Sequence, residues 1–535
     1  MKISLPNSLT PLTTTRDTSR SSDQMLLPLR VLSTLLSKGR KNSFSAGSAK
    51  QSLLSTPDSM GKFFTYLVTT GISSLVLLSG IVLAQEQDNN CSSANTTATN
   101  LEVCSASYLG GQDDDNGTSV EIAPDRSVVL GGRIVDNNFG VTPIDLQAGS
   151  SNSSGGNGVI IRMSPEGKKI LSVTRLGDTV DDLDINRTTG EIAVVGDFGF
   201  AIISSDGAQV LWSQNLGSGG GATFSTGRRV AVGQDGAIAA LFNKQVTVFD
   251  GARNQIGQFT PVGKYIEDVA VDSDTQTVIV TGYTQKNGGK CSQLQVAFVR
   301  GYSYTGQIKW QDYDWTTAQA YATNSSCADT RGVRVAIGKD NLLYFAGESA
   351  GGNTIYNYDS SDLSQNAPNV TFDKYNTPYN TKSNQITYYA RFNPATGEIL
   401  KGQFALARLS KDQGNTIRPQ AITADEDGNV YIGGISGYNI ANRNALSISG
   451  QALGPYSGGD CFLLIVSPDF NTRKTWTSWT AQGSTTSSGT INGVTATAGT
   501  ASVVMTTLGQ LVTKNPIQSE LAGDNDAFYS VFPTP

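Results

Sequence analysis

The sequence predicts an all-β protein in which seven four-stranded sheets form a closed ring. Three observations support this: a hairpin pattern that recurs seven times, a looser pair of strands after each hairpin, and one such strand that stands at the opposite end of the chain from its partner. A single four-stranded sheet cannot bury both of its faces, so repeated sheets are expected to pack radially around an axis. The predicted fold is a seven-bladed β-propeller over residues 101–535.

The recurring hairpin is clearest at residues 420–434 (QAITADEDGNVYIGG), where two short strands flank an Asp-Gly turn. Ile422 alternates with Ala424 before the turn, and Val430 alternates with Ile432 after it. This alternation around an Asp-Gly turn is typical of a β-hairpin. The same unit occurs at residues 119–132, 183–197, 229–243, 268–282, 334–348 and 493–507.

A second pair of strands completes each sheet. An apolar strand follows every hairpin, and in six cases a further strand follows it. The seventh apolar strand, at residues 527–532 (AFYSVF), lacks this successor, whereas residues 102–110 (EVCSASYLG) precede all the hairpins. We expect these two segments to pair and close the ring, which removes the exposed edges of an open array. A β-sandwich is the alternative, but the repeated strand order favours the propeller.

The longer connections are expected to gather on one face. With the strands of each sheet named A to D from the axis outward, the A–B and C–D turns share one face and the B–C and D–A connections share the other. The first set is short. Insertions concentrated on one side of a rigid scaffold are typical of a binding surface. The long B–C connections are residues 133–157, 284–294, 349–387, 435–460 and 508–526.

One insertion, residues 349–387, is rich in aromatic residues among Asn, Asp and Ser. Aromatic faces for stacking and adaptable polar groups at their edges suit a glycan or a flat protein partner. The alternative is that these aromatic side chains hold a long loop against the sheet below. The candidate binding residues are Tyr356, Tyr358, Phe372, Tyr375 and Tyr379.

Acidic residues suggest two further kinds of site. Asp113 and Asp115 are candidate ligands for Ca²⁺, although their spacing departs from that of a calcium-binding loop. No other cofactor is expected. Carboxylates just before the A strands are expected to accept hydrogen bonds from the backbone. The alternative is a carboxylate pair for glycan cleavage at the central channel. These carboxylates are Asp181, Asp182, Glu267, Asp268 and Asp329.

The composition excludes several classes of function. The chain has no histidine, which rules out a Ser-His-Asp triad, a Cys-His dyad and any His-ligated metal. The net charge is −6 and no basic run falls within residues 101–535, so nucleic acid is not an expected partner.

The five cysteines show no CxxC spacing. In an exported protein, Cys91 with Cys104 and Cys291 with Cys327 are candidate disulfides. The second pair falls in consecutive connections of the same face. Cys461 begins an apolar strand and is expected to be a buried free thiol.

The region before the repeats is predicted to direct export. Residues 1–59 show no stable periodicity and are expected to be disordered, as either a wrongly assigned start or a transit peptide. Residues 60–84 (MGKFFTYLVTTGISSLVLLSGIVLA) have the charged start and apolar stretch of a signal peptide. An uncleaved signal anchor is the alternative and would be the one expected membrane contact. Residues 85–100 form a polar linker.

The hairpins at residues 268–282 and 420–434, with the apolar strands VAFV (296–299) and CFLLIV (461–466), resemble the bacterial SBBP-type β-propeller repeat of exported surface proteins. The resemblance covers most of residues 101–535, although the hairpin at 493–507 lacks the Asp-Gly turn. TGQIKW (305–310) is also similar to quinoprotein-like propeller repeats. The resemblance implies an extracytoplasmic location and a binding or structural role, and it transfers no site residues.

The sequence thus predicts an exported protein that binds a glycan or protein partner through its insertion-bearing face and does not catalyse a reaction. It is expected to be secreted, periplasmic or attached to the cell surface. The alternatives are a glycan hydrolase with carboxylates in the central channel and a structural component of the cell surface.

Overall fold

Each hairpin predicted from the sequence forms a pair of antiparallel strands in the computed structural model. The structure describes residues 91–135, 139–149, 155–216, 227–369, 385–408, 414–456, 458–482, 484 and 489–535, all within one compact unit, residues 84–535. The predicted extension (1–59), signal peptide (60–84) and start of the linker (85–90) lie outside the described residues. Among the described residues, no helix has the length and apolar character needed to cross a membrane.

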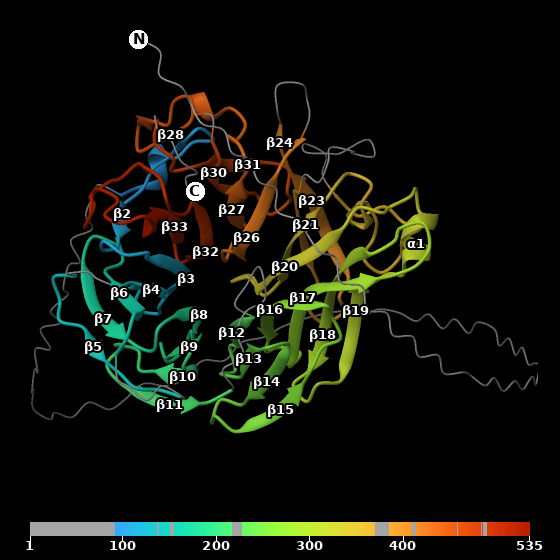
Figure 1. Cartoon of the computed structure of the whole chain (residues 1–535), viewed down its shortest axis with the longest axis horizontal. Coiled ribbons are helices and arrows are strands. Elements are labelled where there is room, and N and C mark those ends of the chain that lie inside the picture. Colours follow the sequence, from blue (N-terminus) through green and yellow to red (C-terminus); the bar gives the residue numbers. More distant parts are fainter. Residues whose placement is uncertain are drawn as a thin grey trace, which may run out of the picture. The chain divides into compact units, whose positions relative to one another are not determined.

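Seven sheets in the described part of the chain contain at least four strands, arranged in a propeller-like manner (Figure 1). The first sheet contains β3 (Asn116–Ile122), β4 (Val128–Arg133), β6 (Gly158–Met163), β7 (Ile170–Arg175) and the short β5 (Ile144–Asp145). The second contains β8 (Val180–Ile185), β9 (Ile192–Gly196), β10 (Gly199–Ile203) and β11 (Val210–Gln214). The third contains β12 (Arg228–Val232), β13 (Ile238–Phe242), β14 (Gln245–Phe249) and β15 (Gln255–Phe259).

The remaining sheets follow the same strand order. The fourth contains β16 (Tyr265–Asp272), β17 (Thr277–Lys286), β18 (Leu294–Ser303) and β19 (Ile308–Tyr313). The fifth contains β20 (Thr330–Ile337), β21 (Leu343–Ser349), β22 (Ile386–Phe392) and β23 (Ile399–Ala405). The sixth contains β26 (Ile417–Ala424), β27 (Val430–Ser436), β30 (Asp460–Val466) and β31 (Arg473–Thr477). The seventh contains β32 (Thr490–Thr497), β33 (Thr500–Thr507), β34 (Asp526–Pro533) and β2 (Ser105–Leu109).

Short elements occupy the connections. β1 (Asn100–Leu101), β28 (Ser447–Ile448) and β29 (Gln451–Ala452) form a small sheet, and β24 (Ala407–Arg408) pairs with β25 (Gly414–Asn415). The helical elements are α1 (Thr317–Ala322) and the 3-10 helices η1 (Ser93–Asn95), η2 (Ile355–Asn357) and η3 (Arg443–Ala445).

The predicted pairing of the first and last strands is confirmed. β2 lies antiparallel to β34, with Ser105 opposite Val531 and Tyr108 opposite Phe528. The rings of Tyr108 and Phe528 meet edge to face with centroids 5.1 Å apart. One strand in the seventh sheet therefore comes from the beginning of the described chain and three come from its end.

The core lies between neighbouring sheets. Ala270 and Ile279 of the fourth sheet pack with Val335 and Phe345 of the fifth, and all four side chains are buried. Interior strands such as β30 are buried at every position, which explains their continuous apolar sequence. The innermost strands contact one another in the sequence β3, β8, β12, β16, β20, β26 and β32, and β32 contacts β3.

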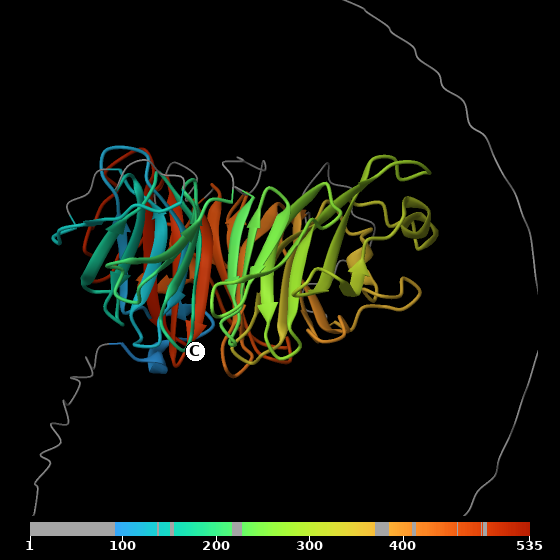
Figure 2. The ribbon, with the colours of Figure 1, turned by 90° about the horizontal axis from the view of Figure 1, so that it is seen from below.

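The connections divide between the two faces as predicted. Figure 2 shows the sheets edge-on, with the C-terminus at the face that carries the short A–B and C–D turns. The B–C and D–A connections, which include the insertions, leave from the opposite face, called here the insertion-bearing face. Glycine supports the tight turns where φ is positive, as at Gly428 (φ 77°).

The insertions are expected to gather on one face as a binding surface. In the structure, parts of them also run along the outermost strands of the sheets. β5 pairs in parallel with β7. The insertion of the seventh sheet brings Lys514 beside Ala106 of β2, with two backbone hydrogen bonds of 2.8 and 3.0 Å. In the fifth sheet, the Gly402 amide donates to the Pro368 carbonyl at 2.7 Å. The unpaired backbone groups of an edge strand need partners, and the insertions supply them.

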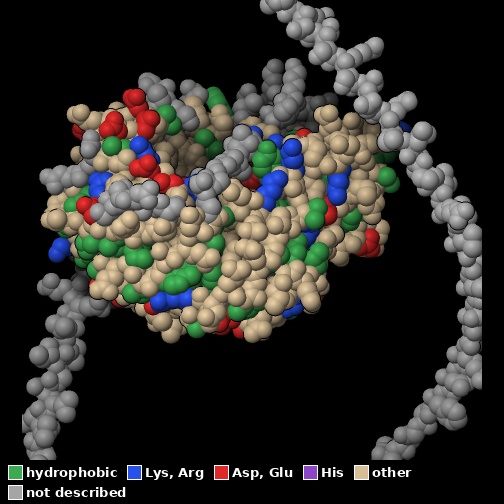
Figure 3. All heavy atoms as spheres, turned by 60° about the horizontal axis from the view of Figure 1, so that its bottom comes forward, with side chains coloured by type: hydrophobic (Ala, Val, Ile, Leu, Met, Phe, Trp, Pro, Cys, Tyr) green, Lys and Arg blue, Asp and Glu red, His purple; other side chains and the backbone are tan. Residues whose placement is uncertain are grey.

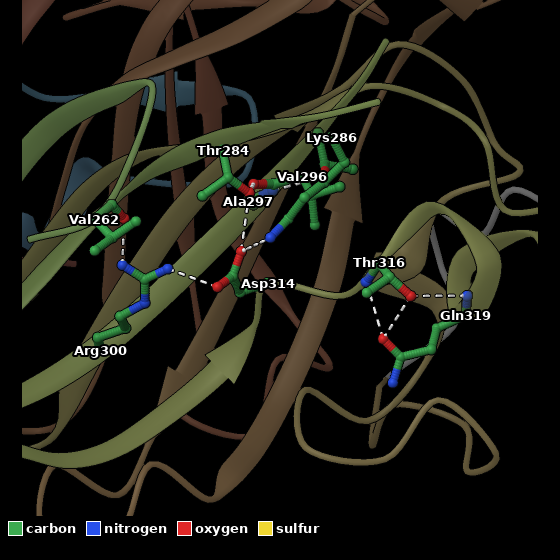
Figure 4. Close-up of polar contacts among 10 residues, drawn as sticks. Val262, Thr284, Lys286, Val296, Ala297, Arg300, Asp314, Thr316 and Gln319 are labelled. Atoms are coloured by element: carbon green, nitrogen blue, oxygen red, sulfur yellow. Dashed lines mark hydrogen bonds and ion pairs between the residues drawn. The ribbon is translucent and has the colours of Figure 1, made fainter. Parts of the chain in front are cut away.

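The chain leaves the fourth sheet at Asp314, which has a positive φ of 57°. Its carboxylate accepts hydrogen bonds from Thr284 Oγ1 (2.9 Å) and Arg300 Nη2 (2.7 Å) and pairs with Lys286 Nζ at 2.9 Å (Figure 4). Burial opposes ionisation, yet these hydrogen bonds and charges hold the pKa of Asp314 below its ordinary value. They hold the start of the next connection against the sheet.

The helix α1 follows directly. Thr316 and Gln319 form a capping box, in which the Thr316 hydroxyl accepts from the Gln319 amide and the Gln319 side chain accepts from the Thr316 amide (Figure 4).

Both predicted disulfides are confirmed. Cys91 bonds Cys104 with Cα atoms 5.0 Å apart, and Cys291 bonds Cys327 with Cα atoms 5.3 Å apart. Cys461 is buried and free of a disulfide, as predicted. Disulfides persist in oxidising compartments, so the two bonds indicate an extracytoplasmic environment.

Candidate functional site

A cavity of about 160 Å³ lies where the innermost strands of all seven sheets face one another. It is called here the central cavity. Two contacts cross it near the short turns: Arg187 Nη2 donates to the Ile337 carbonyl (3.3 Å), and Gln234 Nε2 donates to Asn341 Oδ1 (2.6 Å). These contacts narrow the side of the cavity that faces the short turns. Figure 3 shows a hollow on the insertion-bearing face.

Four charged residues on successive inner strands line the cavity with alternating sign, and we call them the charged quartet: Asp182 (β8), Arg229 (β12), Asp268 (β16) and Arg334 (β20). Arg229 Nη1 lies 3.6 Å from Asp182 Oδ1, and Arg229 Nε lies 3.9 Å from Asp268 Oδ1. Both distances suit ion pairs but exceed the usual range of an N–H···O hydrogen bond.

The aspartates of the quartet also join neighbouring sheets. Asp182 Oδ2 accepts a hydrogen bond from the Val230 amide (3.1 Å), and Asp268 Oδ2 accepts one from the Val335 amide (2.9 Å). Asp329 likewise accepts from the Gln295 amide at 2.8 Å. The prediction that these carboxylates accept backbone hydrogen bonds is confirmed.

The other two residues of that set behave differently. Asp181 forms an ion pair of 2.6 Å with Arg228. Glu267 is buried close to Arg229 and Arg334.

Burial sets the protonation of the cavity groups. It raises the pKa of Asp182 to about 7, although the charge of Arg229 opposes the shift. It likewise raises the pKa of Glu121 to about 7 against the charge of Lys339. Burial, with the neighbouring charge of Arg229, lowers the pKa of Arg334 to about 10. Burial therefore favours the neutral form of these three groups.

A second group of residues lies on the insertion-bearing face, at the ends of strands from the third, fourth and fifth sheets. Two tyrosine rings, of Tyr265 and Tyr283, have centroids 5.2 Å apart. Lys244 Nζ and Lys264 Nζ lie 5.8 and 6.0 Å from the Tyr265 ring, and the Arg331 guanidinium lies 5.3 Å from the Tyr283 ring. We call these five residues the rim cluster.

Four members of the rim cluster are accessible at least in part, and the fifth, Tyr283, is buried. Lys244 and Lys264 are exposed, and Tyr265 and Arg331 are half-buried. Sequence reasoning missed the cluster because its members come from three sheets and sit outside the aromatic-rich insertion. The one local signal was the Lys264–Tyr265 pair at the start of an inner strand.

The predicted binding tyrosines that the structure describes are buried. Tyr356 in η2 is 0% exposed, stacks on Tyr388 with centroids 4.4 Å apart, and donates from its hydroxyl to the Arg331 carbonyl (3.0 Å). Tyr358 is also buried, and its hydroxyl accepts from Asn324 Nδ2 at 2.8 Å. Both side chains hold the insertion to the sheet, which is the alternative given for them above, and their role in binding a partner stays a prediction.

The insertion holds three further candidate binding residues. Phe372, Tyr375 and Tyr379 lie outside the described residues.

The candidate calcium ligands have different surroundings. Asp115 is buried, and its carboxylate accepts hydrogen bonds from the amides of Gly111 (2.6 Å) and Val135 (2.7 Å). Asp113 is exposed. Within the described part of the chain, no group of three or more His, Cys, Asp or Glu residues is arranged to hold a metal ion. Asp115 thus holds the start of β3 in the same way that Asp329 holds the start of β20.

No protein-family model matches the chain, and no curated protein matches it. The similarity to SBBP-type repeats therefore stays a prediction. Arguments about function depend on the central cavity and the rim cluster.

Proposed function

We propose that this protein is an exported, closed seven-bladed β-propeller that binds a glycan or protein partner through its insertion-bearing face without catalysing a reaction. The pairing of β2 with β34 and the continuous contacts among the innermost strands support a closed ring. The two disulfides support export to an oxidising compartment. A signal peptide at residues 60–84 would deliver it there.

The rim cluster is the observation that carries the binding proposal. It presents the half-buried ring of Tyr265 and three cations together on one face, beside the longer connections. Aromatic faces stack on sugar rings or apolar side chains, and lysine and arginine pair with carboxylates or sulfates. The expected partner is therefore an acidic glycan or an acidic protein surface.

Glycan-array binding and pull-down with the mature exported protein test the proposal. Tyr265→Ala and Lys264→Glu are expected to weaken binding by at least about tenfold, because each removes a contact worth roughly 1 kcal/mol or more. Tyr438→Ala is the matched control, since Tyr438 is an exposed tyrosine (36%) in another insertion. Unchanged binding by both rim variants would contradict the proposal.

A glycan hydrolase is the second candidate, and the carboxyl groups of the central cavity favour it. Asp182 and Glu121 have pKa values of about 7 and lie close to other carboxylates, Asp268 and Asp184. A carboxylic acid that stays protonated near neutral pH beside an ionised carboxylate is the arrangement used for glycoside cleavage. Turnover of a glycan by the native protein, abolished in Asp182→Asn or Glu121→Gln, would replace the non-catalytic proposal with this one.

A further inference from the structure

The donors of Arg229 in the central cavity are poorly satisfied. The residue is 9% exposed, and its Nε makes no hydrogen bond among the described residues. Its nearest carboxylate oxygens, on Asp182 and Asp268, are 3.6 and 3.9 Å away. Burial alone would lower the pKa of Arg229, but the charges of Asp182 and Asp268 raise it above its ordinary value, so the guanidinium is held charged. The cavity is therefore suited to a group that accepts hydrogen bonds from the guanidinium donors that line it.

The charged quartet limits what that group can be. Each aspartate uses one carboxylate oxygen for a backbone amide of the next sheet and turns the other toward Arg229. An anion in the cavity would be attracted by the two arginines but repelled by the two aspartates. A cation would be attracted by the aspartates but repelled by the arginines. A hydroxyl group accepts from a guanidinium and donates to a carboxylate at once, so it fits between them without added charge.

From this arrangement we infer that the central cavity binds one neutral, polyhydroxylated unit such as a single sugar ring. Its hydroxyls would lie between Arg229 and the carboxylates of Asp182 and Asp268, with Arg334 as the opposite donor. The cavity of about 160 Å³ suits a small solute. This inference rests on the proposed function, because it assigns a sugar-binding position below the rim cluster on the same face.

Titration calorimetry of the mature exported protein tests the inference. The probes are the neutral sugars glucose, galactose, mannose and N-acetylglucosamine, with glucuronate as the anionic arm and glucosamine as the cationic arm. At least one neutral sugar is expected to bind more tightly than both charged probes. Failure of every neutral sugar to bind, or preference for either charged probe, would overturn the inference.

Variants assign the site. Arg229→Gln and Asp182→Asn are expected to weaken binding of the neutral sugar by at least about tenfold, because each removes a charge-assisted hydrogen bond. Asp182→Asn keeps the side-chain size and an oxygen for the Val230 amide, so it serves where Arg229→Gln fails to fold. Wild-type affinity in a folded Asp182→Asn variant would overturn the inference.

The rim variant Lys264→Glu separates this inference from the proposed function. It is expected to lose the larger partner while retaining wild-type affinity for the single sugar. Loss of the larger partner in Lys264→Glu, with no sugar bound in the cavity of the wild type, would overturn the cavity site and leave the proposed function standing. If the sugar binds and Asp182→Asn weakens that binding, but no larger partner is found, the cavity site stands and the proposed function is overturned.

Discussion

The third and fifth sheets have the same four-stranded core but differ in their connections. In the third sheet, β13 and β14 are joined by residues 243–244, and the outermost strand β15 is exposed at Gln255, Ile256 and Gln258. In the fifth sheet, a long insertion separates β21 from β22, and residues 402–405 of its outermost strand β23 are buried. The insertion covers an edge that the compact sheet leaves open.

From the sequence, a long insertion indicates a binding surface, but in the fifth sheet it covers an edge strand. Ordering a loop costs conformational entropy, which burial of its own aromatic side chains can offset. Tyr356 and Tyr358 make such contacts. The aromatic side chains described in this insertion are therefore evidence of edge protection, whereas the half-buried Tyr265 ring of the rim cluster lies at the start of an ordinary strand.

The largest expected effect concerns a buried ion pair inside an insertion. Arg443 is 2% exposed, lies 3.3 Å from Asp460 and donates to the Gly454 carbonyl at 2.9 Å. Arg443→Ala leaves Asp460 buried without its partner and is expected to lower the free energy of unfolding by about 3–5 kcal/mol. Chemical denaturation measures this value.

The control lies in the compact sheets. Arg253 pairs with Glu191 at 2.9 Å, but both side chains are about a third exposed (29% and 30%). Arg253→Ala is expected to cost less than about 1 kcal/mol. A similar decrease in the free energy of unfolding for the two variants would show that the ion pair in the insertion is no more buried than the one in the compact sheets.

The second prediction compares two stacked aromatic pairs. Tyr356→Ala removes a fully buried ring stacked on Tyr388 and is expected to cost about 3–4 kcal/mol. Phe259→Ala removes a half-buried ring of the compact third sheet, stacked on Tyr302 at 4.7 Å, and is expected to cost roughly half as much. Thermal and chemical denaturation measure both losses. An equal cost would mean that Tyr356 is not an anchor of the insertion.

The third prediction concerns the disulfide between two insertions. Replacing Cys291 and Cys327 by Ser removes a link across 36 residues and is expected to cost about 2–4 kcal/mol, because the unfolded chain regains entropy. Replacing Cys91 and Cys104 opens a link across only 13 residues and is expected to cost less. A larger decrease in the free energy of unfolding on replacing Cys91 and Cys104 would contradict this prediction.

The smallest expected effect depends on pH. Asp312 on β19 accepts a hydrogen bond of 2.9 Å from Ser360 of the fifth-sheet insertion, and burial raises its pKa to about 7. A carboxyl group with a raised pKa in the folded state stabilises the fold fully below about pH 4, and that stabilisation is lost as the pH rises to about 7. Asp312→Asn is expected to remove this dependence of the free energy of unfolding on pH.

A carboxylate in a compact sheet should behave oppositely. Hydrogen bonds from Ser204 and the Ala208 amide lower the pKa of Asp206 in a turn of the second sheet. Its contribution is present near neutral pH and is lost as the pH falls below its ordinary pKa. Unfolding curves of Asp312→Asn and Asp206→Asn between pH 3 and 8 should therefore depart from wild type at opposite ends. Departure at the same end would contradict both assignments.

Much of the fold was predictable because its signals are local. An Asp-Gly turn between alternating strands, as at Asp427–Gly428, identifies a hairpin from neighbouring residues alone. The pairing of β2 with β34 was predictable because one sheet lacked a strand that the chain held elsewhere. The pairing of Cys291 with Cys327 was supported by their places in consecutive connections of one face.

The candidate site was much less predictable. The sequence analysis singled out Asp182 and Asp268 but not Arg229 or Arg334. These charges meet only when the innermost strands face one another. The rim cluster joins Lys244, Tyr265 and Arg331 from three sheets, so no single stretch reveals it.

The sequence by itself determined the strands, their order in each sheet and the residues that turn inward, because these depend on periodicity and turn chemistry between near neighbours. Only the tertiary structure decided where the insertions run and which charges share a cavity. Both depend on contacts between residues far apart in the chain, where an unpaired edge or a buried guanidinium takes whichever partner the packing brings near.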